Sequence, residues 1–320
     1  MKQILLLIII ILNTSIYSKE EKKENIEKFK NLSYIIKPFF REEALYLSIN
    51  SISAVDNQKH DIKYKPNADL KLGLEVSIYD WALSFSISPP KSQDDIEKYG
   101  KTTAFDIQLN YIDKNFELDI YIQKYKGFYL LEIEELNSES DVLALREDLS
   151  LKKLGVNFLY TSNDNFSLKT GFRQNKIQKK SVSSFILLYG IEYFSLKGDK
   201  NLIPKELNEK NILDFIYYGG EYYTFSIAPG YGYISNNEGF FFSGIFFLGL
   251  GIQYQKNIFD ARETQTTLSL KLNTRVSFGY RAENYSIGIL VIADGTLSSV
   301  KTVSIQQESA MGELYWSYRL

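Results

Sequence analysis

The sequence predicts an all-β protein: a closed antiparallel transmembrane β-barrel of about twelve strands, with ten to fourteen compatible with the pattern. Apolar and polar residues alternate over long stretches, which is typical of strands with one apolar and one polar face. The chain contains 24 Tyr and 21 Phe but only 2 Trp, more large rings than a single soluble core readily holds. The alternation also continues to the last residue, Leu320.

The N-terminus predicts export. Lys2 precedes an uninterrupted apolar run, Ile4 to Leu12, and a small polar stretch that ends at Ser18. This pattern is typical of a secretory signal peptide, here residues 1–18, and the run is shorter than the about 20 residues that span a bilayer. Residues 19–31 carry mostly charge of both signs, and 19–41 are predicted to form a charged N-terminal periplasmic segment. The barrel domain is then expected over 42–320.

The strands follow in order after this segment. The clearest alternation covers 69–78, 81–88, 105–111, 116–123 and 268–280. Weaker candidates cover 43–55, 154–161, 165–174, 183–196, 222–234, 240–255, 284–293 and 311–320. Tight turns join some of them, whereas long polar loops are expected at 56–67, 89–101, 127–150, 197–220 and 294–304. These are thirteen segments, and a barrel with both ends in the periplasm needs an even number, so twelve is expected, with the error placed in 181–235.

Alternation alone fits a secreted soluble β-protein as well as a membrane barrel. The aromatic residues favour the barrel, because many lie at or near strand ends, where rings form girdles at the level of the lipid headgroups. These residues are Tyr79, Trp81, Tyr111, Tyr160, Tyr233, Tyr254, Tyr280 and Tyr285. A lipid-facing sheet must also close, since lipid offers no hydrogen bonds to a free edge.

The C-terminal strand suggests the first partners. Leu314, Trp316, Tyr318 and Leu320 alternate up to the chain end, as in the insertion signal of outer-membrane barrels, although those usually end in an aromatic residue. We therefore expect contacts with outer-membrane lipid, and with the barrel-assembly machinery through this strand. The expected location is the bacterial outer membrane.

Several segments resemble a known family. They are IKYKPNADLKLGL (62–74), YDWALSFSI (79–87), YKGFYL (125–130), QKKSVSSF (178–185) and PGYGY (229–233). They are similar to an uncharacterised bacterial family, domain of unknown function 4421, whose members are expected to form outer-membrane β-barrels. The resemblance implies fold and location, and it assigns no catalytic residue.

The polar faces of the strands predict what lines the lumen. Six cations and six anions are expected there: Lys71, Lys169, Arg173, Lys271, Arg275 and Arg319, with Glu75, Asp106, Glu117, Asp119, Glu192 and Glu313. A lining of mixed sign does not select ions. The preferred interpretation is a salt-bridged, largely filled interior, and the alternative is a narrow path for a small solute.

Composition and motifs argue against other functions. The absence of cysteine excludes disulfides and thiolate chemistry, and 37 Lys+Arg against 39 Asp+Glu give no basic field for nucleic acid. The one histidine, His60, lies beside Asp61 in a predicted loop near Ser51 and Ser53, and a barrel-borne lipid-modifying enzyme is the alternative function. No G-x-S-x-G motif supports it, so no enzyme activity is expected. No cofactor or metal is expected either, and the acidic run around Glu132–Asp141 is interpreted as a solvated loop rather than a calcium site.

Overall fold

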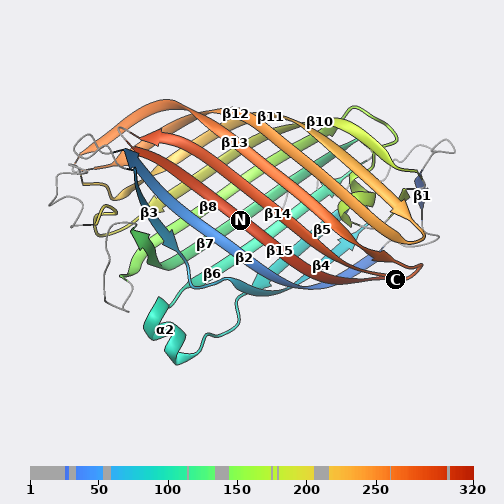
Figure 1. The fold of residues 1–320 in the computed structure, drawn as a ribbon, viewed down its shortest axis with the longest axis horizontal. Coiled ribbons are helices and arrows are strands. Elements are labelled where there is room, and N and C mark those ends of the chain that lie inside the picture. The colour runs from blue at the N-terminus through green and yellow to red at the C-terminus, as the bar shows by residue number, and fades with distance from the viewer. Residues whose placement is uncertain are drawn as a thin grey trace, which may run out of the picture.

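The computed structural model describes residues 26–28, 34–52, 59–113, 115–133, 144–173, 176–178, 180–204, 216–259, 261–300 and 303–320. The predicted signal peptide lies outside these residues and stays a prediction. The elements are labelled in Figure 1 where there is room. They are β1 (Ile26–Lys28), β2 (Tyr34–Ile52), β3 (Lys59–Lys65), β4 (Leu70–Ile78), β5 (Trp81–Ile87), α2 (Gln93–Tyr99), β6 (Thr103–Ile112), β7 (Phe116–Ile133), β8 (Leu145–Thr161), η1 (Lys169–Arg173), β9 (Lys176–Gln178), β10 (Val182–Lys197), β11 (Gly219–Asn237), β12 (Phe240–Ile258), β13 (Arg262–Arg281), β14 (Tyr285–Val300) and β15 (Val303–Arg319).

Thirteen strands form one antiparallel sheet that closes on itself (Figure 1). Its order is β15-β14-β13-β12-β11-β10-β8-β7-β3-β2-β4-β5-β6, and the pairings β15–β2 and β7–β6 close the ring. A closed wall leaves no free edge, so its backbone groups can pair within the protein, as a lipid environment requires. The predicted closed antiparallel barrel is confirmed.

The number of strands changes along the barrel axis. At the end of the barrel where the chain terminates, β2 pairs with β4 over Tyr34–Glu42. Towards the opposite end of the barrel, β2 pairs instead with β3 over Leu47–Ile52. β7 changes partner in the same way, from β6 to β3. Twelve strands, all except β3, therefore form the ring at the end with short turns, hereafter the short-turn end. At the opposite, long-loop end β3 replaces β4, β5 and β6, which leaves ten.

Outward side chains form an apolar band around the wall. On β13 Leu268, Leu270, Leu272 and Phe278 are all exposed, whereas the alternate residues Ser269, Lys271, Asn273, Arg275 and Ser277 are buried and face the interior. At about 3.3 Å per residue and a tilt of about 45°, the stretch from Leu268 to Tyr280 rises about 28 Å, close to the about 25 Å band of membrane barrels. The band identifies the fold as a transmembrane barrel.

Aromatic residues border this band on both sides. At the short-turn end ring pairs include Tyr34–Tyr79, Trp81–Tyr111, Phe185–Tyr231 and Phe240–Tyr280. At the other border Tyr193, Tyr223 and Tyr254 of β10, β11 and β12 form a row. Seven of the eight residues predicted from strand ends lie at the short-turn border, and Tyr254 lies at the other.

The lumen is filled differently along its length. Towards the long-loop end one contiguous apolar cluster, hereafter the upper core, joins Leu45, Leu47 and Ile49 of β2 to Phe194, Leu196 and Tyr222 of β10 and β11. These strands lie far apart around the ten-strand ring, so their side chains meet across the lumen. Two smaller apolar clusters lie towards the short-turn end. Between these layers the interior is polar.

The segment after β8 fills the short-turn end instead of forming the strand predicted at 165–174. Phe166 and Leu168 are fully buried among inward residues of β8, β10, β11 and β12, and residues 169–173 form the π-helical turn η1. Phe172 packs against both apolar clusters at this end, so η1 bridges the two walls. Apolar residues that would have faced lipid on a strand are here buried in the lumen.

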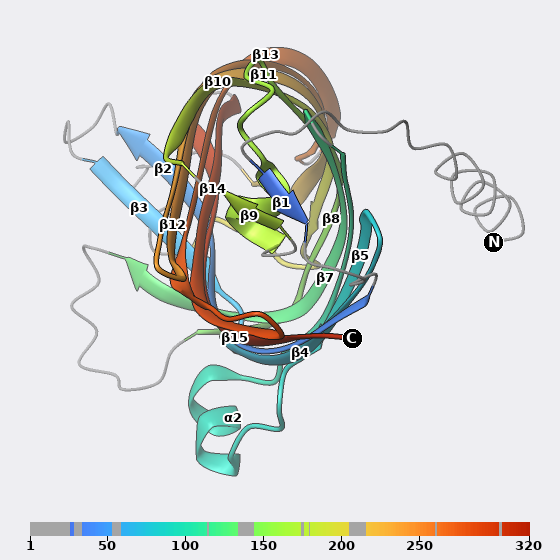
Figure 2. The ribbon, with the colours of Figure 1, turned by 90° about the vertical axis from the view of Figure 1, so that its right-hand side faces the viewer.

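Other predicted boundaries were also wrong. The barrel wall begins at Tyr34 rather than residue 42, and Ile26–Lys28, predicted as part of the N-terminal periplasmic segment, pair with β9. In the view along the barrel, β1 and β9 lie within the outline of the ring (Figure 2).

The predicted loop 56–67 contains β3, and the loop 89–101 contains α2, which projects from the outer wall. β7, β8, β14 and β15 extend well into the predicted loops 127–150 and 294–304. No helix among the described residues has the length and apolar character needed to cross a membrane.

Candidate functional site: a buried ion-pair layer in the lumen

The polar layer contains most of the charged side chains predicted from alternation. Eleven of the twelve predicted residues are described and buried: Lys71, Glu75, Asp106, Glu117, Asp119, Lys169, Glu192, Lys271, Arg275, Glu313 and Arg319. The side chain of the twelfth, Arg173 in η1, lies outside the description. Lys169 is also in η1 rather than on a strand, and it pairs with Asp80 in the β4–β5 turn.

One group of charges lies where the wall changes from twelve strands to ten. Lys71 on β4 donates to Glu43 on β2 at 2.5 Å, to Asp106 on β6 at 3.2 Å and to the Tyr125 hydroxyl on β7 at 2.6 Å. Only 1% of Lys71 is exposed. A single ammonium therefore joins the four strands whose pairing changes at this level.

A second group surrounds Glu313 on β15, whose carboxylate is fully buried. It accepts from Lys37 Nζ at 2.9 Å and from Arg41 Nη2 at 2.7 Å, both on the neighbouring strand β2. Lys37 also contacts Glu75 at 3.3 Å, and Arg41 lies 3.9 Å from Asp106. The last contact connects this group to the one around Lys71.

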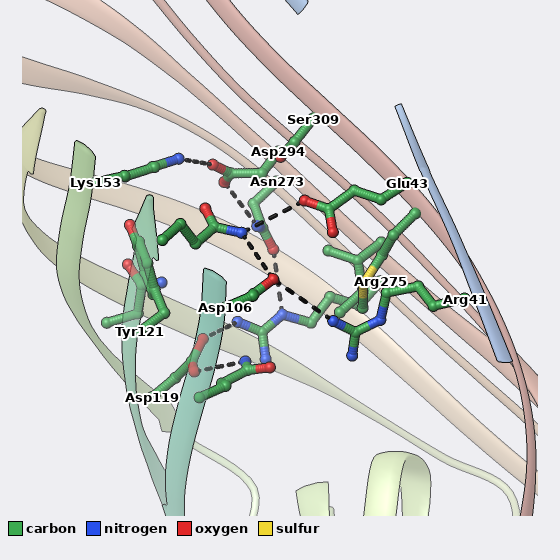
Figure 3. A pocket seen from close by; sticks show the side chains of 15 residues that line it. Arg41, Glu43, Asp106, Asp119, Tyr121, Lys153, Asn273, Arg275, Asp294 and Ser309 are labelled. Carbon is green, nitrogen blue, oxygen red and sulfur yellow. Dashed lines mark hydrogen bonds and ion pairs between the residues drawn. The ribbon is translucent and has the colours of Figure 1, made fainter. Parts of the chain in front are cut away.

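A third group crosses the lumen and is drawn in part in Figure 3. Arg275 on β13 pairs with Glu117 at 2.9 Å and Asp119 at 3.4 Å, both on β7. Asp294 on β14 contacts Lys271 on β13 at 2.7 Å and Lys153 on β8 at 3.2 Å. Lys153 also contacts Glu192 at 3.1 Å, and Glu192 accepts from Tyr121 at 2.6 Å. These bonds connect walls that are distant in sequence.

Charges of this layer are paired rather than arranged as a ring of one sign. Each of its six cations, Lys37, Arg41, Lys71, Lys153, Lys271 and Arg275, lies within 4.0 Å of at least one carboxylate. Where charged side chains select ions, they form rings of one sign. The arrangement therefore suits cross-linking of the walls better than ion selection.

A cavity of about 90 Å³ remains among these side chains. Its lining includes Arg41, Asp106, Tyr121, Asn273 and Arg275, which point towards one another in Figure 3. A cavity of this size has room for several water molecules. Within the described ranges no group of three or more His, Asp or Glu side chains is arranged to hold a metal ion.

Sequence reasoning missed five charges of this layer for two reasons. Lys37 and Arg41 precede the boundary predicted at residue 42, whereas Lys153 and Asp294 lie one residue beyond the segments 154–161 and 284–293. Glu43 lies within a predicted strand but was not assigned to its polar face. Alternation extended past the predicted boundaries would have reached Lys37, Arg41, Lys153 and Asp294, whereas Glu43 needed its face to be assigned.

The other candidates from the sequence gain little support. His60 lies in strand β3, not in a loop, and the register places it opposite Ser51 of β2. The acidic run is described only up to Ile133 at the end of β7, and its remaining carboxylates lie outside the described residues.

Fold and site together define a transmembrane β-barrel with a charged, tightly bonded lumen. A family model for a domain of unknown function, DUF4421, matches residues 15–320, and the chain belongs to this family. The resemblance seen in the sequence is thereby confirmed. A comparison with curated protein sequences finds no match.

Similar solved structures are outer-membrane barrels. The outer membrane protease OmpT from Escherichia coli is 7% identical with a TM-score of 0.40, covering 91% of this chain and 98% of the protease. The outer membrane protein OmpT of Vibrio cholerae, folded in vitro, is 7% identical with a TM-score of 0.35 and coverages of 92% and 100%. The toluene transporter TodX of P. putida is 9% identical with a TM-score of 0.22 and coverages of 90% and 90%. Similarities this low carry no information about activity.

Proposed function

We propose that the protein is an integral outer-membrane barrel with a closed lumen and a structural or cell-surface role. Three successive layers support this proposal: the upper core, the ion-pair layer, and the apolar packing around η1. The upper core carries most weight, because its side chains meet across the full width of the lumen.

An ion entering from the long-loop end would meet buried leucine, isoleucine and tyrosine side chains rather than water. Leu47, Ile49 and Tyr222 are at most 1% exposed. Moving an unpaired charge into such surroundings is strongly unfavourable. A steady current would therefore require the upper core to open.

Single-channel recording in a planar bilayer tests the proposal with the full chain. We expect no steady conductance steps from barrels whose folding is verified by heat-dependent migration on a denaturing gel. A porin of known conductance, inserted in the same bilayer, is the control. Reproducible steps from the protein alone would contradict the closed lumen.

Narrow passage of a small solute is the second candidate, and the polar cavity in the ion-pair layer favours it. If the protein conducts, Asp294→Asn removes one charge from the cavity lining and should shift the ratio of cation to anion permeability. An unchanged ratio would place the path elsewhere.

We further propose that the protein is exported by the predicted signal peptide and has no lipid-modifying activity. Cell fractionation tests the location, and recovery from the soluble periplasm without detergent would contradict it. A lipid-hydrolysis assay that compares the wild type with His60→Ala tests the activity, and hydrolysis that disappears in the variant would support an enzyme.

A further inference from the structure

We propose that the outer wall of β6, β7 and β8 binds the phosphate of a membrane lipid through a lysine patch, defined by Lys101, Lys124, Lys126 and Lys152. The patch lies at the border of the apolar band nearer the long-loop end. The inference requires only that the barrel spans a membrane, so it does not depend on whether the lumen conducts.

The position of the patch is set by the alternation of side chains. On β7 the exposed, lipid-facing Ile122 is followed on the same face by Lys124 and Lys126. On β8 the lipid-facing Leu154 is preceded on that face by Lys152. The register pairs Lys124 directly with Lys152. Both strands therefore change from apolar to cationic at one level, where lipid headgroups are expected.

This pairing is unfavourable without an anion. Directly opposite side chains on antiparallel strands are about 5 Å apart, and like charges there are destabilising. Among the described residues no carboxylate forms an ion pair with Lys124, Lys126 or Lys152. On the same faces of β6, β7 and β8, from this level down to the short-turn end, every residue is uncharged. An anion from outside the protein would satisfy all three ammonium groups.

Other lysines at the same border lie beside a carboxylate of the protein. Lys197 on β10 pairs with Glu221 on β11 at 2.7 Å, and Glu221 lies opposite Lys256 of β12. On the side of β2 and β15 the outward charges are acidic, Glu42 and Glu308. The patch thus brings three lysines together with no ion-paired carboxylate on the described wall, as expected for a binding site rather than general attraction to a membrane.

The segment after α2 holds the fourth lysine at the edge of the patch. Gly127 on β7 has φ +90°, and a Cβ there would lie 2.1 Å from the Lys101 carbonyl oxygen, so the two backbones are in close contact. Thr102 donates to the Gly127 carbonyl at 2.7 Å. Tyr99 at the end of α2 packs on Tyr129 of β7 with ring centroids 5.1 Å apart. These contacts hold the backbone of Lys101 against β7. Thr103, two residues further along the chain, lies opposite Lys126 in the sheet.

Native mass spectrometry of the folded full-length protein in a non-ionic detergent tests the proposal. The probes are dimyristoyl phosphatidic acid, whose phosphate is exposed, and zwitterionic dimyristoyl phosphatidylcholine. The test variant is K124Q/K126Q/K152Q, and the matched control is K197Q/K256Q, which removes lysines at the same border that face Glu221. Each lysine near an anionic headgroup contributes about a fivefold change in affinity.

We expect the wild type and the control to prefer phosphatidic acid, and the test variant to lose at least about tenfold in affinity for it. The triple Lys→Arg variant should retain binding, because it keeps the charge. Equal binding by wild type and test variant would overturn the proposal. Displacement of the lipid by inorganic phosphate at equal concentration would also overturn it, because it would indicate a free-phosphate site.

A measurement of stability distinguishes lipid binding by these lysines from a purely structural role. Removing the repulsion between Lys124 and Lys152 should leave the test variant at least as resistant to urea as the wild type. A loss of resistance together with loss of lipid would assign the lysines to the fold instead. If the triple variant fails to fold, Lys152→Gln alone should bind phosphatidic acid about fivefold more weakly, and unchanged binding would overturn the proposal.

Discussion

Asp294→Asn should destabilise the barrel strongly while hardly changing its shape. The Asp294 carboxylate accepts from Lys271 at 2.9 Å, from Lys153 at 3.2 Å and from Asn273 at 2.9 Å. Asparagine has the same size and keeps one acceptor oxygen, so the substitution removes mainly the charge. The measured effect then reports how dry the ion-pair layer is.

The size of the expected loss of stability follows from the partners that each lysine keeps in Asp294→Asn. Lys153 keeps Glu192 at 3.1 Å, whereas Lys271 keeps, among the described residues, only the Thr296 hydroxyl at 3.4 Å. Removing one partner of a buried ion pair costs about 3–5 kcal/mol. Lys197→Gln, which breaks the exposed pair with Glu221, should cost only about 0.2–1 kcal/mol.

Urea unfolding in lipid vesicles, followed by tryptophan fluorescence, measures both values. Trp81 and Trp316 are the only tryptophans of the chain, and both lie in the short-turn aromatic girdle, so unfolding moves them from lipid to water. A second variant, Lys271→Met with Asp294→Leu, removes both charges and should recover most of the lost stability, because apolar replacement of a buried pair is often neutral. Equal small losses for Asp294→Asn and Lys197→Gln would mean that the layer is hydrated and that its ion pairs do not hold the walls together, which would refute this prediction.

Three further changes test other parts of the structure. Lys71→Met leaves Glu43 and Asp106 without their shared ammonium, so the free energy of unfolding should fall by about 3 kcal/mol or more. The same urea titration measures this loss, and a loss below about 1 kcal/mol would contradict the role of Lys71 where the number of strands changes. Leu272→Arg, in the middle of the apolar band, should cost about 2–4 kcal/mol in vesicles, whereas Thr266→Arg beyond the band should cost about 0–1 kcal/mol, and equal costs would misplace the band. Gly127→Ala should loosen the segment around α2, because the φ of +90° at Gly127 and the nearby Lys101 carbonyl oxygen disfavour a Cβ. The expected result is faster proteolysis within 88–102 while the migration of the barrel on a gel is unchanged. An unchanged proteolysis rate would contradict that contact.

The sequence predicted the closed antiparallel barrel and its twelve-strand ring because lipid imposes one simple pattern. Within the band, each outward residue must be apolar and each inward residue can be polar, and this alternation is visible in the segments 69–78 and 268–280. Lys271, Arg275 and Glu117 were assigned to the polar face by that rule, and the structure buries all three. The ion-pair partners of these residues depend on which strands face one another across the ring. The alternation within a single strand carries no information about that.

The π-helical turn η1 shows another limit of the pattern. Residues 165–174 are apolar enough for a lipid-facing strand, and no local signal distinguishes that position from a filling of the lumen. Phe166 and Leu168 are buried because the twelve-strand ring leaves space at the short-turn end that its own inward side chains do not fill. Only the size of the closed ring sets that demand, so it cannot be read from the segment itself.

The wrong strand boundaries have one physical cause, which β8 shows most clearly. Leu149 and Leu151 face the upper core, whereas Leu154, two residues before Val156, faces lipid, so the apolar residues change from odd to even positions at Lys152 and Lys153. β8 itself continues without interruption from Leu145 to Thr161. Beyond the band the outside of the wall meets water, and the interior becomes an ordinary apolar core.

β2 shows the same inversion. Phe40 faces lipid at an even position, and Leu45, Leu47 and Ile49 face the upper core at odd positions. A search for one continuous alternation ends where the two phases meet, and it assigns the rest of each strand to a loop or, for β2, to the N-terminal segment. The level at which the phase inverts therefore marks the edge of the lipid band, and on β7 and β8 it coincides with Lys124 and Lys152. The lysine patch thus lies where one strand pair passes from lipid to water.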